Sequence, residues 1–439
     1  MNARAIAIQV LSRVRATDAY LNVVLDTVLS ESPPADPRDA GLISELTYGA
    51  ARRQLALDYA ITRFADRKLE ALEDKVLAGL RVGAYQIFYT RVPARAAVAE
   101  TVQALKEVGL ARAAGFVNAI LRKLASLPSL PLPPETDALE HLSVRESHPK
   151  WMVERWVRQF GRERAEAMLV ANNQTPPVVI RANSGKVTRD ALLEQLRETG
   201  LEVRPTAVSP VGIVLPPLGR LEDVYGYAEG LWQVQDEAAQ LVGVYGDIPE
   251  TARVLDACAA PGGKACHLAE KHEVVATDLH ANKLRKIESE AKRLGLTPRL
   301  RAEAHDASQP WPQEWGEFHA FLVDAPCSGL GTLRRHPELR YRRKPEDIGR
   351  LAVLQRRILE NCQEAVPPGG LLVYAVCTLD PQEGQDQVEM FLRSHPEWTA
   401  EPPVLHESVK LPLTQAYLRT LPGPESWDGF FAARLRKLY

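Results

Sequence analysis

The chain has 439 residues, of which 45% are hydrophobic and 25% are charged, and its formal net charge is −2 at pH 7. This length predicts roughly two to four domains, and the charge excludes a globally basic nucleic-acid binder while leaving room for a local basic face. No apolar run reaches the roughly 18 residues of a membrane span. The N-terminus lacks the apolar core and cleavage site of a signal peptide, so we expect a cytoplasmic protein.

The N-terminal region has the hydrophobic pattern of an all-α domain. Apolar residues recur at helical spacing within residues 5–14, 76–88 and 102–110. Residues 1–130 contain 17 basic and 13 acidic side chains, so this region is mildly positive. A Pro-rich stretch at 127–134 then predicts a linker or domain boundary. We expect the first domain to span residues 1–130.

Residues 140–230 have a mixed pattern. The segment 146–172 is predicted to be helical, and strands are predicted at 178–183, 201–204 and 212–215, with a helix at 188–198. This pattern indicates a connecting region that is helical at first and then forms a small α+β unit.

The pattern changes again for residues 231–439, where short apolar runs alternate with helical segments. The runs lie at 254–256, 274–278, 321–324 and 371–375. Such runs suit parallel strands that are covered on both faces. They predict a doubly wound, Rossmann-like α/β domain, in which ligands bind at the carboxyl ends of the strands.

A glycine-containing loop follows the first of these strands and opens a helix. It reads Ala-Cys-Ala-Ala-Pro-Gly-Gly-Lys at 257–264, and Asp278 ends the next strand. Adjacent glycines allow close approach of a ligand to the backbone, and an acid at the end of the second strand suits a ribose diol. The loop therefore predicts a nucleoside-bearing cofactor. It matches neither the dinucleotide fingerprint nor the Walker phosphate loop.

All five cysteines lie in the C-terminal half of the chain. An odd count and the absence of CxxC or Cys/His clusters argue against a disulfide framework and a metal site. Cys327, in Asp-Ala-Pro-Cys, and Cys377 each follow a predicted strand, whereas Cys258, Cys266 and Cys362 are expected to be packing residues. Paired thiols at adjacent strand ends suit covalent catalysis on a cytosine, because a thiolate that adds to C6 makes C5 nucleophilic. The alternative is that both are buried core cysteines.

Four stretches together resemble the RNA cytosine-5 methyltransferase family, and within it the bacterial 16S rRNA branch called Sun or Fmu. They lie at 257–264 with Asp278, at 305–308, at 324–343 and at 374–384. The segment 230–238 also fits the family pattern. Residues 115–122 resemble the helical RNA-binding domain of the antitermination factor NusB, which this branch carries. The resemblance spans nearly the whole chain.

The resemblance implies that S-adenosyl-L-methionine is the cofactor and that small-subunit ribosomal RNA is the substrate. It implies that Cys377 attacks the base and that Cys327 helps to resolve the adduct. Asp324 is expected to face the amino edge of the cytosine. One departure is Ala265, where a hydroxyl residue commonly follows the lysine. The cofactor-binding residues implied are Cys258, Ala259, Ala260, Pro261, Gly262, Gly263, Lys264, Asp278, Asp306 and Asp324.

A basic run follows the Asp-Ala-Pro-Cys segment, with one acid, Glu338, among its eleven residues. Its position next to the candidate active site predicts contacts with RNA phosphates. The alternative is a solvated charged face. The predicted RNA-binding residues are Arg334, Arg335, Arg340, Arg342, Arg343 and Lys344.

Two other functions remain open at this point. The first is a non-enzymatic RNA-binding or transcription factor, which would not bind S-adenosylmethionine. The second is an amino-group methyltransferase for adenine or guanine, which would need a [DN]-P-P-[YF] turn in place of Asp-Ala-Pro-Cys.

The assignment of the nucleophile also has an alternative. By analogy with DNA cytosine-5 methyltransferases, Cys327 instead of Cys377 would be the nucleophile. We expect a monomer that needs no metal and no membrane.

Overall fold

The computed structural model describes residues 2–34, 36, 39–250, 252–423 and 427–439. The chain divides into two compact units: the first comprises residues 1–175 and 333–342, and the second comprises residues 176–332 and 343–439. This division differs from the predicted domains at two places. The helices that follow the Pro-rich stretch belong with the N-terminal helices, and a short segment from within the predicted α/β domain belongs to the first unit.

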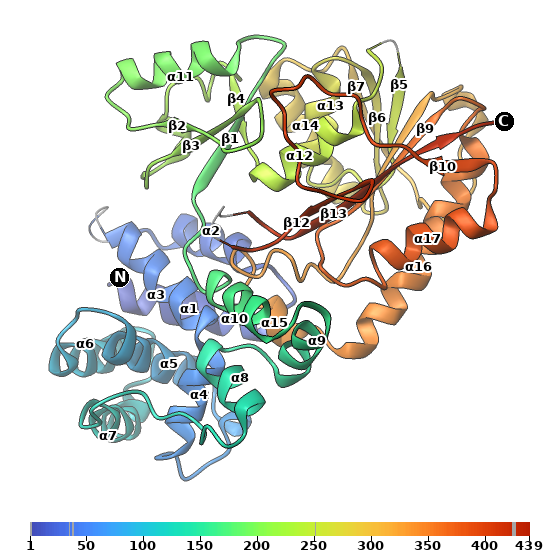
Figure 1. Ribbon diagram of the computed structural model, residues 1–439. Coiled ribbons are helices and arrows are strands. Elements are labelled where there is room, and N and C mark those ends of the chain that lie inside the picture. The colour runs from blue at the N-terminus through green and yellow to red at the C-terminus, as the bar shows by residue number, and fades with distance from the viewer. Residues whose placement is uncertain (1, 35, 37–38, 251, 424–426) are drawn as a thin grey trace. The chain divides into compact units, whose positions relative to one another are not determined.

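Among its described residues, the first unit contains helices and no strand, and Figure 1 shows these helices in blue to green apart from α15. Among the described helices, none is long and apolar enough to cross a membrane. The helices are α1 (Ala3–Ala16), α2 (Leu21–Glu31), α3 (Ala40–Arg52), α4 (Gln54–Thr62), α5 (Asp74–Tyr89), α6 (Ala94–Glu107), α7 (Ala114–Ala125), α8 (Ala138–Glu146), α9 (Lys150–Phe160), α10 (Arg162–Ala171) and α15 (Leu339–Arg342).

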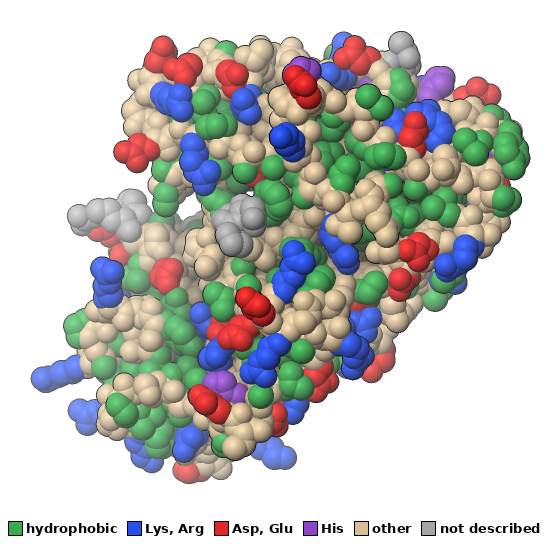
Figure 2. Space-filling model, viewed as in Figure 1, with side chains coloured by type: hydrophobic (Ala, Val, Ile, Leu, Met, Phe, Trp, Pro, Cys, Tyr) green, Lys and Arg blue, Asp and Glu red, His purple; other side chains and the backbone are tan. Residues whose placement is uncertain are grey.

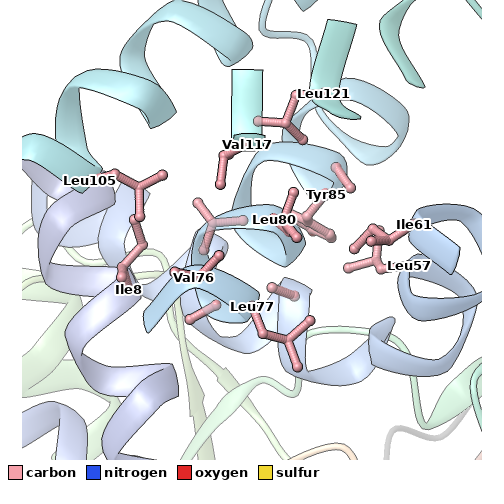
Figure 3. Packing of buried hydrophobic residues seen from close by; sticks show 14 of the residues in the cluster. Ile8, Leu57, Ile61, Val76, Leu77, Leu80, Tyr85, Leu105, Val117 and Leu121 are labelled. Carbon is pink, nitrogen blue, oxygen red and sulfur yellow. The ribbon is translucent and has the colours of Figure 1, made fainter. Parts of the chain in front are cut away.

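Helix α5 provides the centre of the main core of this unit. Leu77 and Leu80 of α5 pack among residues from α1, α4, α6 and α7, including Ile8, Leu57 and Leu105 (Figure 3). The apolar residues at helical spacing are thus the ones that are buried, and the predicted all-α fold of the N-terminal region is confirmed.

The second unit contains two sheets. The smaller sheet has the strand order β2-β3-β1-β4, and its pairs are antiparallel. The helix α11 (Arg189–Glu198) packs on it, with Leu192 and Leu196 in the shared core. The strands are β1 (Val178–Ala182), β2 (Arg204–Pro205), β3 (Gly212–Leu215) and β4 (Trp232–Val234). This is the predicted small α+β unit.

The larger sheet has nine strands in the order β11-β12-β13-β9-β8-β5-β6-β7, with β10 paired to β13. The five strands from β9 to β7 in that order are parallel, and β13 runs antiparallel to β9. The strands are β5 (Arg253–Asp256), β6 (Glu273–Asp278), β7 (Leu300–Ala304), β8 (Ala320–Asp324), β9 (Leu371–Val376), β10 (Trp398–Ala400), β11 (Leu413–Thr414), β12 (Tyr417–Thr420) and β13 (Phe430–Lys437).

Helices cover both faces of this sheet (Figure 1). Alternate strand residues face opposite cores, so that Val254 packs with α12 (Glu237–Gly246), α13 (Gly263–Ala269) and α14 (Ala281–Leu294). Its neighbour Leu255 packs with α16 (Pro345–Ala365) and α17 (Gln385–Ser394). The predicted doubly wound α/β fold is confirmed. Figure 2 shows basic and acidic side chains interspersed over the face in view.

Candidate active site

The parallel strands carry polar residues where they end, and we call Asp256, Asp278, Asp324 and Cys377 the carboxyl edge. These residues end β5, β6 and β8 or follow β9. The sheet continues from β5 to β6 and β7 on one side and to β8 and β9 on the other. Ligands bind in such sheets at the point where the strand order reverses, which here is between β5 and β8.

The loop after β5 forms a tight turn that needs glycine. The amide of Gly262 donates to the carbonyl oxygen of Ala259 at 2.7 Å. Gly262 has φ +104°, and a Cβ atom there would lie 3.2 Å from Cγ1 of Ile287 in α14. A side chain at this position would therefore be both strained and crowded. The amide of Ala259 donates to the carbonyl oxygen of Thr277, which ties the loop to β6.

Two further predicted acids lie in the loops after β6 and β7. Oδ1 of Asp278 accepts a hydrogen bond of 2.9 Å from the amide of His280, and Lys283 lies 3.5 Å from the same oxygen. Oδ1 of Asp306 accepts from the amide and the hydroxyl of Ser308. The backbone bond, followed by the side-chain bond, lowers the pKa of Asp306, so this carboxylate stays ionised at neutral pH.

Asp256 is a member of the carboxyl edge that sequence reasoning did not select. It is fully buried, and no side chain of the described residues forms a hydrogen bond with its carboxylate. Burial, followed by the charge of Asp324, raises the pKa of Asp256 to about 8. The sequence did mark its position, because it is the last residue of an apolar strand before the glycine loop.

Lys264 and Asp324 form a partly buried ion pair at the carboxyl edge. Nζ of Lys264 lies 2.7 Å from Oδ2 of Asp324, and the side chains are 11% and 27% exposed. Burial by itself would lower the pKa of Lys264, but the charges of Asp324, Cys377 and Asp256 and the hydrogen bond with Asp324 raise it overall. The ammonium group of Lys264 is therefore held charged against Asp324.

The two predicted catalytic thiols are in contact. Sγ of Cys327 lies 3.3 Å from Sγ of Cys377. Two cysteines that are 50 residues apart in sequence are brought together because β8 and β9 are adjacent and parallel. The hydrogen bond with Cys377, burial and the neighbouring negative charges raise the pKa of Cys327 well above its ordinary value. Cys327 is thus stabilised as the neutral thiol.

A buried glutamate, Glu383, connects the loops of the two cysteines and was not selected from the sequence. Its carboxylate accepts from the amide and hydroxyl of Ser328 at 2.7 and 2.5 Å. The Ser328 hydroxyl also lies 2.9 Å from that of Thr378, next to Cys377. Gln355 of α16 bonds both Glu383 and the carbonyl oxygen of Pro326. This network fixes the two loops relative to each other.

Known proteins match this chain over nearly its whole length. Family models match at residues 247–436 (16S rRNA methyltransferase RsmB/F), 1–126 (NusB family) and 148–218 (RsmF/B-like ferredoxin-like domain). The probable ribosomal RNA small subunit methyltransferase B of Bacillus subtilis is 35% identical over 99% of this chain and 98% of its own length. The ribosomal RNA small subunit methyltransferase B of Pseudomonas syringae is 37% identical over 100% and 97%.

The chain belongs to the 16S rRNA methyltransferase RsmB/F family. This confirms the predicted family, with its NusB-like N-terminal domain, and makes the protein an S-adenosylmethionine-dependent methyltransferase. A solved structure of the protein PH0851 has the same fold, with a TM-score of 0.85 and 24% identity over 100% of this chain and 99% of that one. A methyltransferase homologue from Pyrococcus horikoshii matches 69% of this chain and 99% of its own, with a TM-score of 0.58 and 26% identity.

The three remaining cysteines are Cys258, Cys266 and Cys362. Cys266 and Cys362 are fully buried in the two cores on either face of the sheet, as expected of packing residues. Burial raises the pKa of Cys258 well above its ordinary value. Within the described ranges, no group of three or more His, Cys, Asp or Glu side chains is arranged to hold a metal ion.

The basic run includes two buried arginines. Arg340 is fully buried, and its guanidinium donates to the backbone carbonyl oxygens of Arg52, Ser147 and Asn172 and to Oδ1 of Asn173. Arg334 is only 3% exposed. The donors of Arg340 are thus used by groups of the first unit, and contact of these two arginines with phosphates stays a prediction.

The other residues of the run differ in exposure. Arg342 is half-buried, and its guanidinium donates to four backbone carbonyls between residues 14 and 19. Arg343 donates to the carbonyl oxygen of Ser328. Lys344 is exposed at the start of α16. Arginine density in the sequence thus indicated a functional segment but not which side chains are accessible.

Proposed function

We propose that this protein methylates carbon 5 of a cytosine in small-subunit ribosomal RNA, with Cys377 as a transient covalent nucleophile. The observation that carries the proposal is the pair of thiols 3.3 Å apart at the carboxyl edge. An amino-group methyltransferase has no use for such a pair, and a non-catalytic RNA-binding protein has none either. The named relatives act on small-subunit ribosomal RNA, and that substrate would place the reaction in the cytoplasm.

The chemistry requires a nucleophile because C5 of cytosine is itself a poor one. The thiolate of Cys377 forms a bond to C6, and the electron pair of the C5–C6 double bond moves to C5. Bound S-adenosylmethionine would supply the methyl group to C5 and would leave as S-adenosylhomocysteine once its S–CH3 bond is broken. Loss of the C5 proton to a base then restores the double bond and breaks the S–C6 bond, which returns the thiolate.

The electrostatics favour Cys377 over Cys327 as the nucleophile. Cys327, whose pKa is raised, remains protonated and can donate to the sulfur of Cys377. A protonated thiol is a poor nucleophile, so we assign Cys327 to the later step, in which the adduct is resolved.

Asp324 is suited to hold the base. Lys264 occupies one of its carboxylate oxygens, so the second oxygen is left to accept a hydrogen bond from the amino group of cytosine. This contact would distinguish cytosine from uracil, which presents an acceptor at that position.

The residues at the carboxyl edge also fit the cofactor. S-adenosylmethionine carries a positive sulfonium and a positive ammonium group, and a region with several carboxylates and one lysine attracts a cation. Asp256 adds a buried carboxyl group that no side chain engages, and Asp278 is suited to the ribose hydroxyls. The loop Cys258–Lys264 and Asp306 would border the same ligand.

The NusB-like helices would recruit the RNA, and Lys344 with Arg343 would provide phosphate contacts next to the cysteines. Residues 1–130 carry more basic than acidic side chains. We expect one copy of the chain to be sufficient for these contacts.

The test is a denaturing gel of each cysteine variant with substrate RNA and S-adenosylmethionine. Cys377→Ala should abolish turnover and form no covalent complex. Cys327→Ala should also fail to turn over but should accumulate a protein–RNA adduct, because attack proceeds while elimination stalls. Cys362→Ala, at a buried position away from the pair, is the matched control and should turn over without accumulating an adduct. An adduct with Cys377→Ala and none with Cys327→Ala would reverse the two roles.

A further inference from the structure

One arginine of the smaller sheet reaches the loop that begins α13. Arg181 lies in β1 and is fully buried. Its Nη1 donates to the carbonyl oxygen of Gly263 at 3.0 Å and to Oε1 of Gln235 at 2.5 Å. Its Nε and Nη2 donate to Oε1 of Glu270 at 3.1 and 2.7 Å. A single guanidinium thus joins three segments of the second unit.

The partners of Arg181 lie at both ends of α13. Gly263 is the first residue of this seven-residue helix, and Glu270 is the residue that follows it. The second carboxylate oxygen of Glu270 accepts from the amide and hydroxyl of Ser184, just after β1. Both ends of α13 are therefore attached to the smaller sheet, and the start of α13 is continuous with the turn at Gly262.

We propose that Arg181 is a positioning residue for S-adenosylmethionine, which it serves by holding Gly263 and the turn before it in the binding conformation. The inference rests on the proposed assignment of residues 258–264 to the cofactor. A role in stability alone would need only the ion pair with Glu270. Buried ion pairs are weak contributors to stability, because desolvation offsets much of the attraction. The bond to Gly263 adds a contact at the residue that directly follows the turn at Gly262.

Two variants separate the bond to Gly263 from the ion pair. Arg181→Met together with Glu270→Gln removes both charges, so that neither is left buried and unpaired. Arg181→Lys keeps the charge that pairs with Glu270, but a single ammonium group cannot reproduce the fork that also reaches Gly263. Each variant should raise the KM for S-adenosylmethionine about ten-fold, the equivalent of one hydrogen bond to a charged group, with kcat within about two-fold of the wild type.

The matched control is Arg434→Met with Glu401→Gln. Arg434 is also buried and also bonds a carboxylate and a backbone carbonyl, that of Gly246, but it lies in β13. This control should shift the melting temperature without changing the KM. An unchanged KM and an unchanged calorimetric Kd for S-adenosylmethionine in both Arg181 variants would overturn the inference. If Asp278→Ala also left the Kd unchanged, the proposed cofactor site itself would have failed.

Discussion

The two halves of residues 324–343 have different structural roles. The first half ends β8 at the carboxyl edge and places Cys327 against Cys377. The second half, residues 333–342, belongs to the first compact unit, where Arg340 is fully buried. Both halves were predicted from sequence to contact the substrate. A reactive residue at the end of a strand thus predicts where a functional site lies. A dense run of arginines predicts that these side chains make contacts, but it does not predict whether their partners are RNA phosphates or groups of the protein.

Arg340 suits the interior because most of its partners are carbonyl groups. Arg340 bonds three backbone oxygens and one amide oxygen. A guanidinium offers five donors in a fixed plane, more than any other side chain, and it stays charged at neutral pH. Burial lowers the pKa of Arg340 to about 10, which still leaves it protonated. Phosphates are not needed to satisfy this group.

The largest expected effect that would test this comparison is on stability. Arg340→Met should lower the free energy of unfolding by several kcal/mol, because each buried acceptor left without a donor costs about 1–3 kcal/mol. Urea denaturation measures the change. Arg350→Met, at an exposed position on α16, should have little effect. Wild-type stability for Arg340→Met, with a weaker affinity for RNA, would support the prediction from sequence.

The sequence predicted the parts of the site that depend on local pattern. Apolar runs located β5, β6, β8 and β9, and the residues that follow such strands must meet at one edge, so Asp278, Asp324 and Cys377 were predictable. The burial of Arg340 was not, because its acceptors come from residues 52, 147, 172 and 173 and are mostly backbone atoms. Every residue has a backbone carbonyl oxygen, so the sequence does not indicate which of them accept hydrogen bonds from a buried arginine.

The burial of Glu383 and Asp256 was likewise not predictable from the sequence. Acids are usually exposed, so a lone Glu383 after the second cysteine gave no reason to expect a buried residue that bonds Ser328 and Gln355. The antiparallel strands β10 to β13 were also missed. Only their pairing with β9 and with one another distinguishes these segments from loops.

The second largest expected effect is on cofactor binding and tests the role of the carboxyl edge. Asp278→Ala should weaken S-adenosylmethionine binding by about 1.5–3 kcal/mol, on the order of ten- to a hundred-fold in Kd, because a charged acceptor for the ribose hydroxyls is lost. Calorimetry measures the change. Glu288→Ala, on an exposed turn of α14, is the control and should bind normally. Equal affinities for the two variants would mean that Asp278 does not contact the ligand.

A smaller expected effect is on the pH dependence of the free energy of unfolding. The folded protein raises the pKa of Asp256 from 3.8 to about 8, so it binds this proton more tightly than the unfolded chain does. Asp256 therefore stabilises the fold when protonated, and this contribution is lost as the pH rises from about 4 to about 8, with a slope of at most about 1.4 kcal/mol per pH unit. Asp256→Asn should remove this part of the slope in urea titrations without cofactor. The same slope in wild type and variant would contradict the assignment.

The smallest effect separates the accessible from the enclosed members of the basic run. Binding to single-stranded RNA weakens with salt, with a slope of about 0.7 per phosphate neutralised. Lys344 is exposed, so Lys344→Ala should reduce the slope of log K against log salt by about 0.7 and weaken binding equally for RNAs of different sequence.

The guanidinium of Arg342 already bonds the carbonyl oxygens of Val14, Thr17, Asp18 and Ala19. Arg342→Ala should therefore lower the melting temperature and leave the salt slope unchanged. If Arg342→Ala reduced the slope as much as Lys344→Ala, Arg342 would release its backbone partners when RNA binds, and the two halves of residues 324–343 would share one function after all.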